Sequence, residues 1–202
     1  LKGKPPKNNE CCFILENHGI IASATSINKL ISFTELITEK AEKSLNVNFE
    51  HYKKTTEIST ELRLVGYKNM SVLCSEDLII NNFLKKFNIS KVSEPLNPDS
   101  LLYCGLGLMS SSGNFKRSLI KYKYKYRNYP RVIRIKDRIY FVAENILKAK
   151  EIEDVFKSHL YLYSGGIEKR SLSKDDIKRL ESYNPQKNRL RFWFDYEGKK
   201  EK

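Results

Sequence analysis

The sequence lacks any apolar run close to the roughly 20 residues that a bilayer-spanning helix needs. Its start, LKGKPPKNNE, has no signal-peptide core. We therefore expect no membrane segment and a cytoplasmic protein. Hydrophobic residues still make up 40% of the 202 residues, which is enough to build a buried core. The absence of an initiator methionine favours a piece of a longer protein.

Cysteine and histidine are scarce, and their spacings do not match a self-contained metal site. The four cysteines form no CxxC pair, so we expect buried free thiols rather than disulfides. The three histidines, His18, His51 and His159, form no His-x-His pair. His51 lies in a polar region, and His159 falls in a predicted helix, where a packing or surface role explains it most simply.

Acidic residues are outnumbered, with 24 against 37 lysines and arginines, so the formal net charge is +13. The densest basic stretch, residues 116–138, alternates lysine with tyrosine, a pattern that suits phosphate contacts and base stacking. A solvated helix followed by a strand explains the same stretch, and basic residues are also dense at 168–191 and 199–202. We favour the solvated helix and keep nucleic acid as an alternative partner.

Motifs for nucleotide binding and nucleophilic catalysis are missing from the sequence. Gly105 and Gly107 lack the third glycine of a dinucleotide-binding fingerprint, and neither a Walker loop nor a nucleophile elbow occurs. The Asp175–Asp176 pair follows Ser173, which predicts a helix N-terminus rather than a catalytic carboxylate pair. Asp99 follows a proline, and we explain it by a turn, with a site residue as the alternative.

What the chain does contain is an alternation of strands and helices. Residues 11–16 and 19–24 predict two strands joined by a tight turn at Asn17-His18-Gly19, because glycine tolerates positive φ and asparagine is enriched there. Thr25 or Ser26 is a suitable N-cap for a helix that continues to about residue 45 with an apolar stripe.

The remaining elements follow the same alternation. Residues 46–68 are ambiguous, with a short helix and a loop as one interpretation. Further expected elements are a strand at 70–74, a helix at 75–87, a strand at 98–105, a glycine- and serine-rich loop at 105–114, a helix at 115–127, and a strand–turn–strand–helix at 131–163. We expect residues 1–10 to be a flexible segment and residues 182–202 to form a terminal strand and a basic tail.

Residues 131–163 repeat the organisation of the first hairpin and helix. Placing Phe13 on Val132, an offset of 119 residues, aligns both hairpins and both helices without a gap. The aligned pairs include Ile14 with Ile133, Ile20 with Ile139, and Ile27 with Ile146. The turns differ, because a histidine and a glycine occur in the first copy alone. A histidine that the shared architecture does not require is a candidate for chemistry.

The stretch FILENHGIIASATSINKLISFTELITEKAEK, residues 13–43, resembles a segment of the class II aldolase/adducin family. In that family an apolar strand ends in Asn-His-Gly, and another strand and a long helix follow. Residues 94–105, EPLNPDSLLYCG, resemble a Pro-Asp strand motif of some bacterial members. Residues 126–163 and 172–180 resemble their later strand–helix unit and final helix. ENHGII is the most specific element of a resemblance that spans about residues 12–181.

The resemblance implies a divalent-metal aldolase, usually zinc-dependent, that cleaves a carbon–carbon bond in a sugar or sugar phosphate. In the family three histidines hold a metal that stabilises the enediolate, and an acidic side chain transfers protons. His18 matches the third histidine ligand, while Asn17 and Gly19 shape the turn. The implied fold is α/β, a mixed, largely antiparallel sheet flanked by helices in α/β/α layers, incomplete in this chain, and oligomerisation is expected.

The family's other two histidine ligands belong to a His-x-His half-domain that does not precede His18 here. We therefore expect residues 1–202 to be one domain, the C-terminal part of a class II aldolase-like protein that is inactive as an isolated chain. Its partner would be the missing N-terminal half or further copies of the chain. The alternative is a noncatalytic, adducin-like or basic module that binds an anionic partner, nucleic acid or acidic protein.

Overall fold

The computed structural model describes residues 11–87, 92, 94–165 and 171–183. The chain divides into two compact units, Leu1–Glu50 and His51–Lys202, which we call the hairpin unit and the sheet unit. The boundary falls at the start of a helix whose buried side chains pack in the core of the sheet unit. The single class II aldolase-like domain expected from the sequence stays a prediction. The expected segment at 1–10 and the terminal strand lie outside the described residues.

The hairpin unit contains the strand–turn–strand–helix that the sequence predicts. Strands β1 (Cys11–Leu15) and β2 (Gly19–Ser23) pair antiparallel, and helix α1 (Ile27–Leu45) follows. Ser26 is the N-cap, and its side chain accepts a hydrogen bond from the Lys29 amide. None of the described residues of this unit is buried. Its apolar side chains therefore lie largely exposed, with Ile14 at 80% as the most exposed.

The sheet unit is built on a four-stranded sheet in the order β3-β6-β5-β4. Its strands are β3 (Ser71–Cys74), β4 (Met109–Ser111), β5 (Val132–Ile135) and β6 (Arg138–Ala143). β6 pairs antiparallel with both β3 and β5, whereas β4 pairs parallel with β5. The structure thus confirms the predicted α/β class with a mixed, largely antiparallel sheet.

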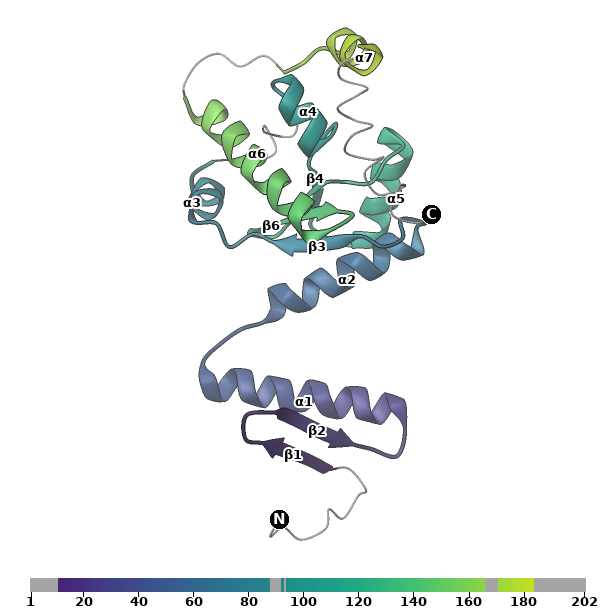
Figure 1. Cartoon of the computed structure of the whole chain (residues 1–202), viewed down its shortest axis with the longest axis vertical. Helices are drawn as coiled ribbons and strands as arrows, with labels where there is room; N and C mark the ends of the chain where they lie inside the picture. Colours follow the sequence, from purple (N-terminus) through teal and green to yellow (C-terminus); the bar gives the residue numbers. More distant parts are fainter. Residues whose placement is uncertain (1–10, 88–91, 93, 166–170, 184–202) are drawn as a thin grey trace. The chain divides into compact units, whose positions relative to one another are not determined.

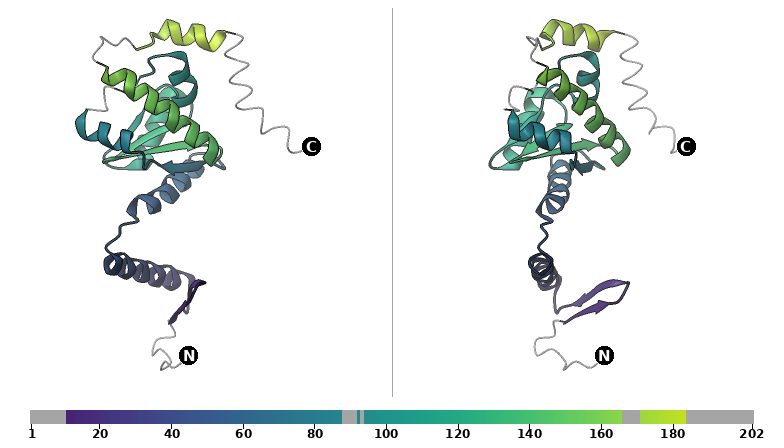
Figure 2. Two further views of the ribbon diagram at one scale, coloured as in Figure 1. Left: turned by 60° about the vertical axis from the view of Figure 1, so that its left-hand side comes forward. Right: turned by 90° about the vertical axis from the view of Figure 1, so that its left-hand side faces the viewer.

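Helices cover both faces of this sheet, and side chains alternate between two cores (Figures 1 and 2). One face packs against α3 (Leu78–Lys86) and α6 (Ile146–Ser164). The other face packs against α2 (Glu50–Leu64) and α5 (Phe115–Tyr126). Along β6, Phe141 belongs to the first core and Tyr140 to the second. In the part of the chain that is described, no helix combines the length and apolar character that crossing a bilayer requires.

Two predicted elements between α1 and α5 differ in the structure, and the region left ambiguous contains a helix. Residues 98–105 form a helix, α4 (Pro98–Cys104), instead of a strand. The reason is a capping box in which the Asn97 side chain accepts the Ser100 amide and the Ser100 hydroxyl accepts the Asn97 amide. The predicted loop at 105–114 contains β4. The ambiguous region 46–68 contains α2, which buries Ile58 and Leu62.

The structure bears out the internal repeat in its helices and corrects it at the turn. Helices α1 and α6 both have 19 residues, and their N-caps Ser26 and Asn145 keep the same offset as their first residues. The first hairpin pairs Leu15 with Gly19 across three residues, whereas the second pairs Ile135 with Arg138 across two. Asn17 and Gly19 both have positive φ, which permits the longer turn. The offset of 119 residues therefore holds for the second strand and the helix of each copy. The first strand needs a shift of one residue, so the gapless alignment is wrong there.

Candidate functional site

His18 lies at the tip of the β1–β2 hairpin and is exposed to solvent. The turn is closed by a hydrogen bond from the His18 amide to the Leu15 carbonyl at 3.2 Å. The ring Nδ1 lies 3.1 Å from the Glu16 carbonyl oxygen. Because a carbonyl can only accept, this contact requires the proton on Nδ1 and leaves the lone pair on Nε2.

The described residues bring no second ligand set to His18. Among them, no group of three or more histidine, cysteine, aspartate or glutamate side chains could hold a metal ion. His51 lies on α2 of the sheet unit, with its Nε2 3.7 Å from a carboxylate oxygen of Glu76. Its ring also contacts the neighbouring Tyr52 ring at 4.1 Å between centroids. The surroundings of His51 are thus an acidic side chain and an aromatic ring.

His159 is a core residue of the sheet unit, which agrees with the packing role expected for it. Its side chain on α6 is only 4% exposed, and its ring stacks on Phe156 at 6.0 Å between centroids. Nε2 lies 3.3 Å from the Val92 carbonyl oxygen and donates its proton there, because that oxygen can only accept. Burial lowers the pKa of His159, although the contact with Val92 opposes that shift.

This lowered pKa predicts how stability depends on pH. The folded state keeps His159 neutral below the pKa of about 6.5 of an unfolded histidine, so the unfolded state binds more protons there. The free energy of unfolding should therefore be highest above about pH 6.5 and should fall as the pH decreases. Urea titrations at several pH values between neutral and mildly acidic would measure this slope. His159→Phe should flatten it, and an unchanged slope in that variant would contradict the assignment.

The cysteines are free thiols, as the sequence predicts. Cys74 is buried and the other three are partly buried. Burial raises the pKa of the Cys104 thiol to about 12, and the positive charge of Arg131 only partly opposes this shift. A thiol with such a pKa is protonated at neutral pH, so Cys104 is a poor nucleophile and a poor metal ligand.

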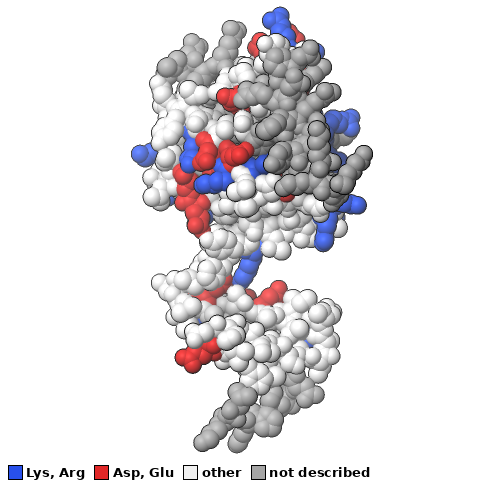
Figure 3. Space-filling model, in the orientation of Figure 1, with Lys and Arg blue, Asp and Glu red and all other residues white. Residues whose placement is uncertain are grey.

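The basic stretch 116–138 forms α5, whose lysines and arginine are exposed while Leu119 and Tyr122 are buried, and then strand β5. This agrees with the solvated helix face and strand favoured from the sequence. In the view of Figure 3, lysine and arginine side chains of the sheet unit occur in several separate places, some of them next to acidic side chains. Arg131 is the exception within the stretch, because it is only 7% exposed. Charge patterning did not distinguish it, since burial of one arginine depends on the helix that packs over it.

The acidic residues weighed in the sequence occupy helix termini. Ser173 caps α7 (Lys174–Ser182), and Asp176 completes a capping box through its hydrogen bonds with the Ser173 amide and hydroxyl. The predicted helix start is therefore confirmed. Asp99 lies in the first turn of α4, where a carboxylate is favourable beside the positive end of the helix. Neither position gathers a catalytic carboxylate pair.

Comparison of the chain with protein-family models, with curated protein sequences and with solved structures finds no match.

Proposed function

We propose that the chain supplies His18 as one ligand of a divalent metal centre, zinc being the expected ion, in a class II aldolase-like carbon–carbon lyase. The substrate would be a sugar or a sugar phosphate. The observation that carries the proposal is the contact between His18 Nδ1 and the Glu16 carbonyl oxygen. Metal-binding histidines commonly donate their second ring nitrogen to a carbonyl in this way, since the contact fixes the tautomer and the ring orientation.

The donor chemistry of the hairpin tip fits one metal ligand. An exposed imidazole with its lone pair on Nε2 is a suitable ligand for zinc, at about 2.0–2.1 Å when bound. One histidine does not hold the ion, and the described residues contain no further cluster of potential ligands. The remaining ligands would therefore come from residues outside the described part, on the same polypeptide or on a partner chain.

In such a centre, the bound ion supplies Lewis acidity, which polarises a carbonyl oxygen of the sugar and lowers the energy of the negative charge that bond cleavage creates. The contribution of this chain is positional. Asn17 and Gly19 hold the turn in its positive-φ conformation, and the paired strands restrict the direction of the imidazole. The Glu16 carbonyl accepts a hydrogen bond from Nδ1, so Nε2 is the ring nitrogen that faces a metal ion.

The proposal predicts that the full-length protein binds zinc and that this binding depends on His18. His18→Ala should lower its zinc affinity by at least about tenfold, because loss of an outer hydrogen-bond partner alone costs roughly 10- to 100-fold. Zinc can be measured by mass spectrometry after dialysis, with affinity obtained by competition against a chelator. Retro-aldol cleavage of sugar phosphates should fall in parallel.

His51→Ala is the matched control for this measurement. It also removes one imidazole, but from α2 of the sheet unit, where the ring contacts Tyr52 and Glu76. Zinc content should stay the same in this variant. Equal zinc content in the wild-type protein and in His18→Ala would refute the metal-ligand assignment.

A second candidate function is a noncatalytic module that binds an anionic partner through α5. This helix carries no acidic residue. Tyr124 on it is 75% exposed, with the Arg127 guanidinium 5.3 Å from its ring centre. Such a helix could contact phosphates and stack a base. Binding of a single-stranded oligonucleotide would then weaken steeply as salt rises, and a flat salt response would rule this candidate out.

A further inference from the structure

We infer that the sheet unit binds an extended acidic peptide of a partner protein, which adds a further strand at the open edge of β3. The site is a groove of about 520 Å³ between α2, the residues that lead into β3, and the first residue of α6. Figure 1 shows α2 beside β3. All residues that line the groove belong to the sheet unit, so the inference does not rest on the metal centre proposed at the hairpin tip.

β3 is an edge strand whose outer backbone groups can pair with another chain. In the sheet order β3-β6-β5-β4, β6 lies on one side of β3, and none of the described strands lies on the other. The sequence of β3, SVLC, contains neither a charged residue nor a proline, which are the residues that commonly protect a strand edge from pairing. An unprotected edge of this kind is suited to strand addition.

The register of β3 determines which of its backbone groups point outward. The Ser75 amide donates to the Ile139 carbonyl of β6 at 2.9 Å, so the residues two and four positions earlier also bond toward β6. Val72 lies between them and therefore directs its N–H and C=O away from β6. Two residues before it, the Met70 carbonyl accepts a hydrogen bond from the Ser59 hydroxyl of α2 at 3.0 Å, which agrees with that direction. Val72 thus offers one donor and one acceptor to an added strand.

The side chains around this edge suit a peptide in which polar and apolar residues alternate. The hydroxyl-bearing residues of α2 that line the groove are Thr55, Thr56, Ser59 and Thr60. Because residues three and four apart lie on the same face of a helix, these hydroxyls form one polar wall. Ile146 of α6, which is 51% exposed, supplies an apolar surface. Successive side chains of an extended strand point to opposite sides, so such a peptide can contact both surfaces.

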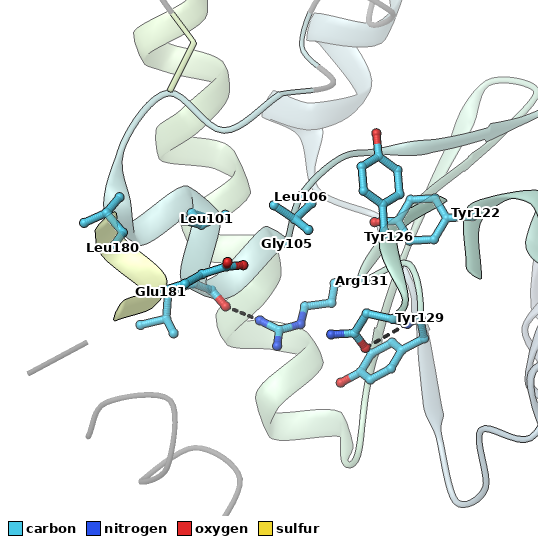
Figure 4. A pocket seen from close by; sticks show the side chains of 11 residues that line it. Leu101, Gly105, Leu106, Tyr122, Tyr126, Tyr129, Arg131, Leu180 and Glu181 are labelled. Atoms are coloured by element: carbon cyan, nitrogen blue, oxygen red, sulfur yellow. Dashed lines mark hydrogen bonds between the residues drawn. The ribbon is translucent and has the colours of Figure 1, made fainter. Parts of the chain in front are cut away.

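The charge of the preferred peptide follows from Arg63. It is the one charged residue among those that line the groove, it is exposed, and it forms no salt bridge within the described part of the chain. Glu57 of the same helix lies outside the groove wall and pairs with Lys54. Arg131 differs, because its Nη1 donates to a carbonyl of α4 and the Glu181 carboxylate lines the same cavity (Figure 4). The net charge of +13 adds a long-range attraction for acidic segments.

Two short peptides test the inference on the full chain. One is acetyl-Val-Thr-Val-Thr-Asp-Glu-amide, and the other has Lys-Lys in place of Asp-Glu. The acidic peptide should bind saturably with a Kd below about 1 mM and at least about tenfold more tightly than the basic one. Amide NMR shifts should place it at β3 and α2. Equal affinity for the two peptides, no saturation, or shifts confined to other elements would overturn the site.

Two protein variants separate the strand edge from the charge. Val72→Pro removes an outward N–H but none of the bonds to β6, so β3 should stay in the sheet while affinity falls at least about tenfold. Val72→Thr keeps the N–H and should keep the affinity. Arg63→Glu leaves the strand unchanged and should reverse the preference between the peptides, whereas Arg117→Glu, the same change at an exposed position of α5, should preserve it. An unchanged preference in Arg63→Glu, or full affinity in folded Val72→Pro, would overturn the inference.

Hydrogen exchange at the Val72 amide distinguishes the peptide from other occupants of the edge. In the peptide-free chain this amide should exchange fast, and the acidic peptide should slow it. Slow exchange without peptide at every protein concentration would mean that the chain covers its own edge. Protection that grows with protein concentration would mean that a second copy pairs there. Either result would overturn the inference.

Discussion

Ile139→Ala should lower the free energy of unfolding of the sheet unit by about 2–5 kcal/mol, the range measured for deletion of a buried aliphatic side chain. Ile139 has no exposed surface and lies on β6 within the core shared with α3 and α6. The substitution removes apolar contacts and leaves a cavity that neighbouring side chains fill only partly. Urea unfolding followed by circular dichroism at 222 nm would measure the loss.

Ile20→Ala is the matched control, because Ile20 occupies the same position in the first copy of the repeat. Its side chain is 51% exposed, so truncation should change stability by no more than about 0.5 kcal/mol. The two variants share the chemical change, the strand position and the following helix. A loss at Ile20 as large as that at Ile139 would contradict the exposure of the hairpin unit.

Ser75→Ala should destabilise the sheet unit by about 1.5–3 kcal/mol, because it removes a hydrogen bond to a buried charge. Ser75 follows β3, is 1% exposed and donates to Glu153 Oε1 on α6 at 2.6 Å. Glu153 is itself only 2% exposed and pairs with the ammonium of Lys150. Without the serine hydroxyl, the carboxylate loses one of its partners where water cannot replace it. The same unfolding titration would report the effect.

Two further variants test whether the loss comes from the buried carboxylate. Ser158→Ala removes an exposed hydroxyl from α6 and should leave stability within about 0.5 kcal/mol of the wild-type value. Ser75→Ala combined with Glu153→Leu should recover much of the loss, since removal of both partners leaves no unsatisfied charge. Additive losses in the double variant would instead indicate that packing dominates at this position.

The sequence predicted those helices and strands whose hydrophobic pattern lies within the element itself. The alternating strands and the apolar stripe of α1 were readable because their periodicity sets which face is apolar. α4 was missed because residues 98–105 were interpreted as a short strand, although Asn97 and Pro98 form a recognisable helix start. β4 could not be found by periodicity, since three residues carry too little pattern and its pairing with β5 is a tertiary contact.

At the candidate sites, the sequence identified individual residues, but their contacts and their burial became known only from the structure. The Asn-His-Gly turn was predicted to place His18 at a hairpin tip, and it lies there. The contact that fixes its tautomer depends on the folded turn and could not be foreseen. The sequence could not distinguish Arg131 from the other basic residues of its stretch. Its burial depends on the last turn of α4 and the tyrosine rings of α5, which lie beside it only in the folded chain.

Because the hairpin–helix motif occurs twice in this chain, one copy can serve as the reference for the other when the effect of neighbouring elements on the motif is measured. A similar hairpin and a 19-residue helix occur once with no buried residue, and once with the hairpin inside the four-stranded sheet and the helix packed on one of its faces. Differences in amide hydrogen exchange between equivalent positions, corrected for intrinsic rates, would report how much protection neighbouring elements add to local propensity. Both copies experience identical solvent, temperature and concentration, so the comparison needs no second protein.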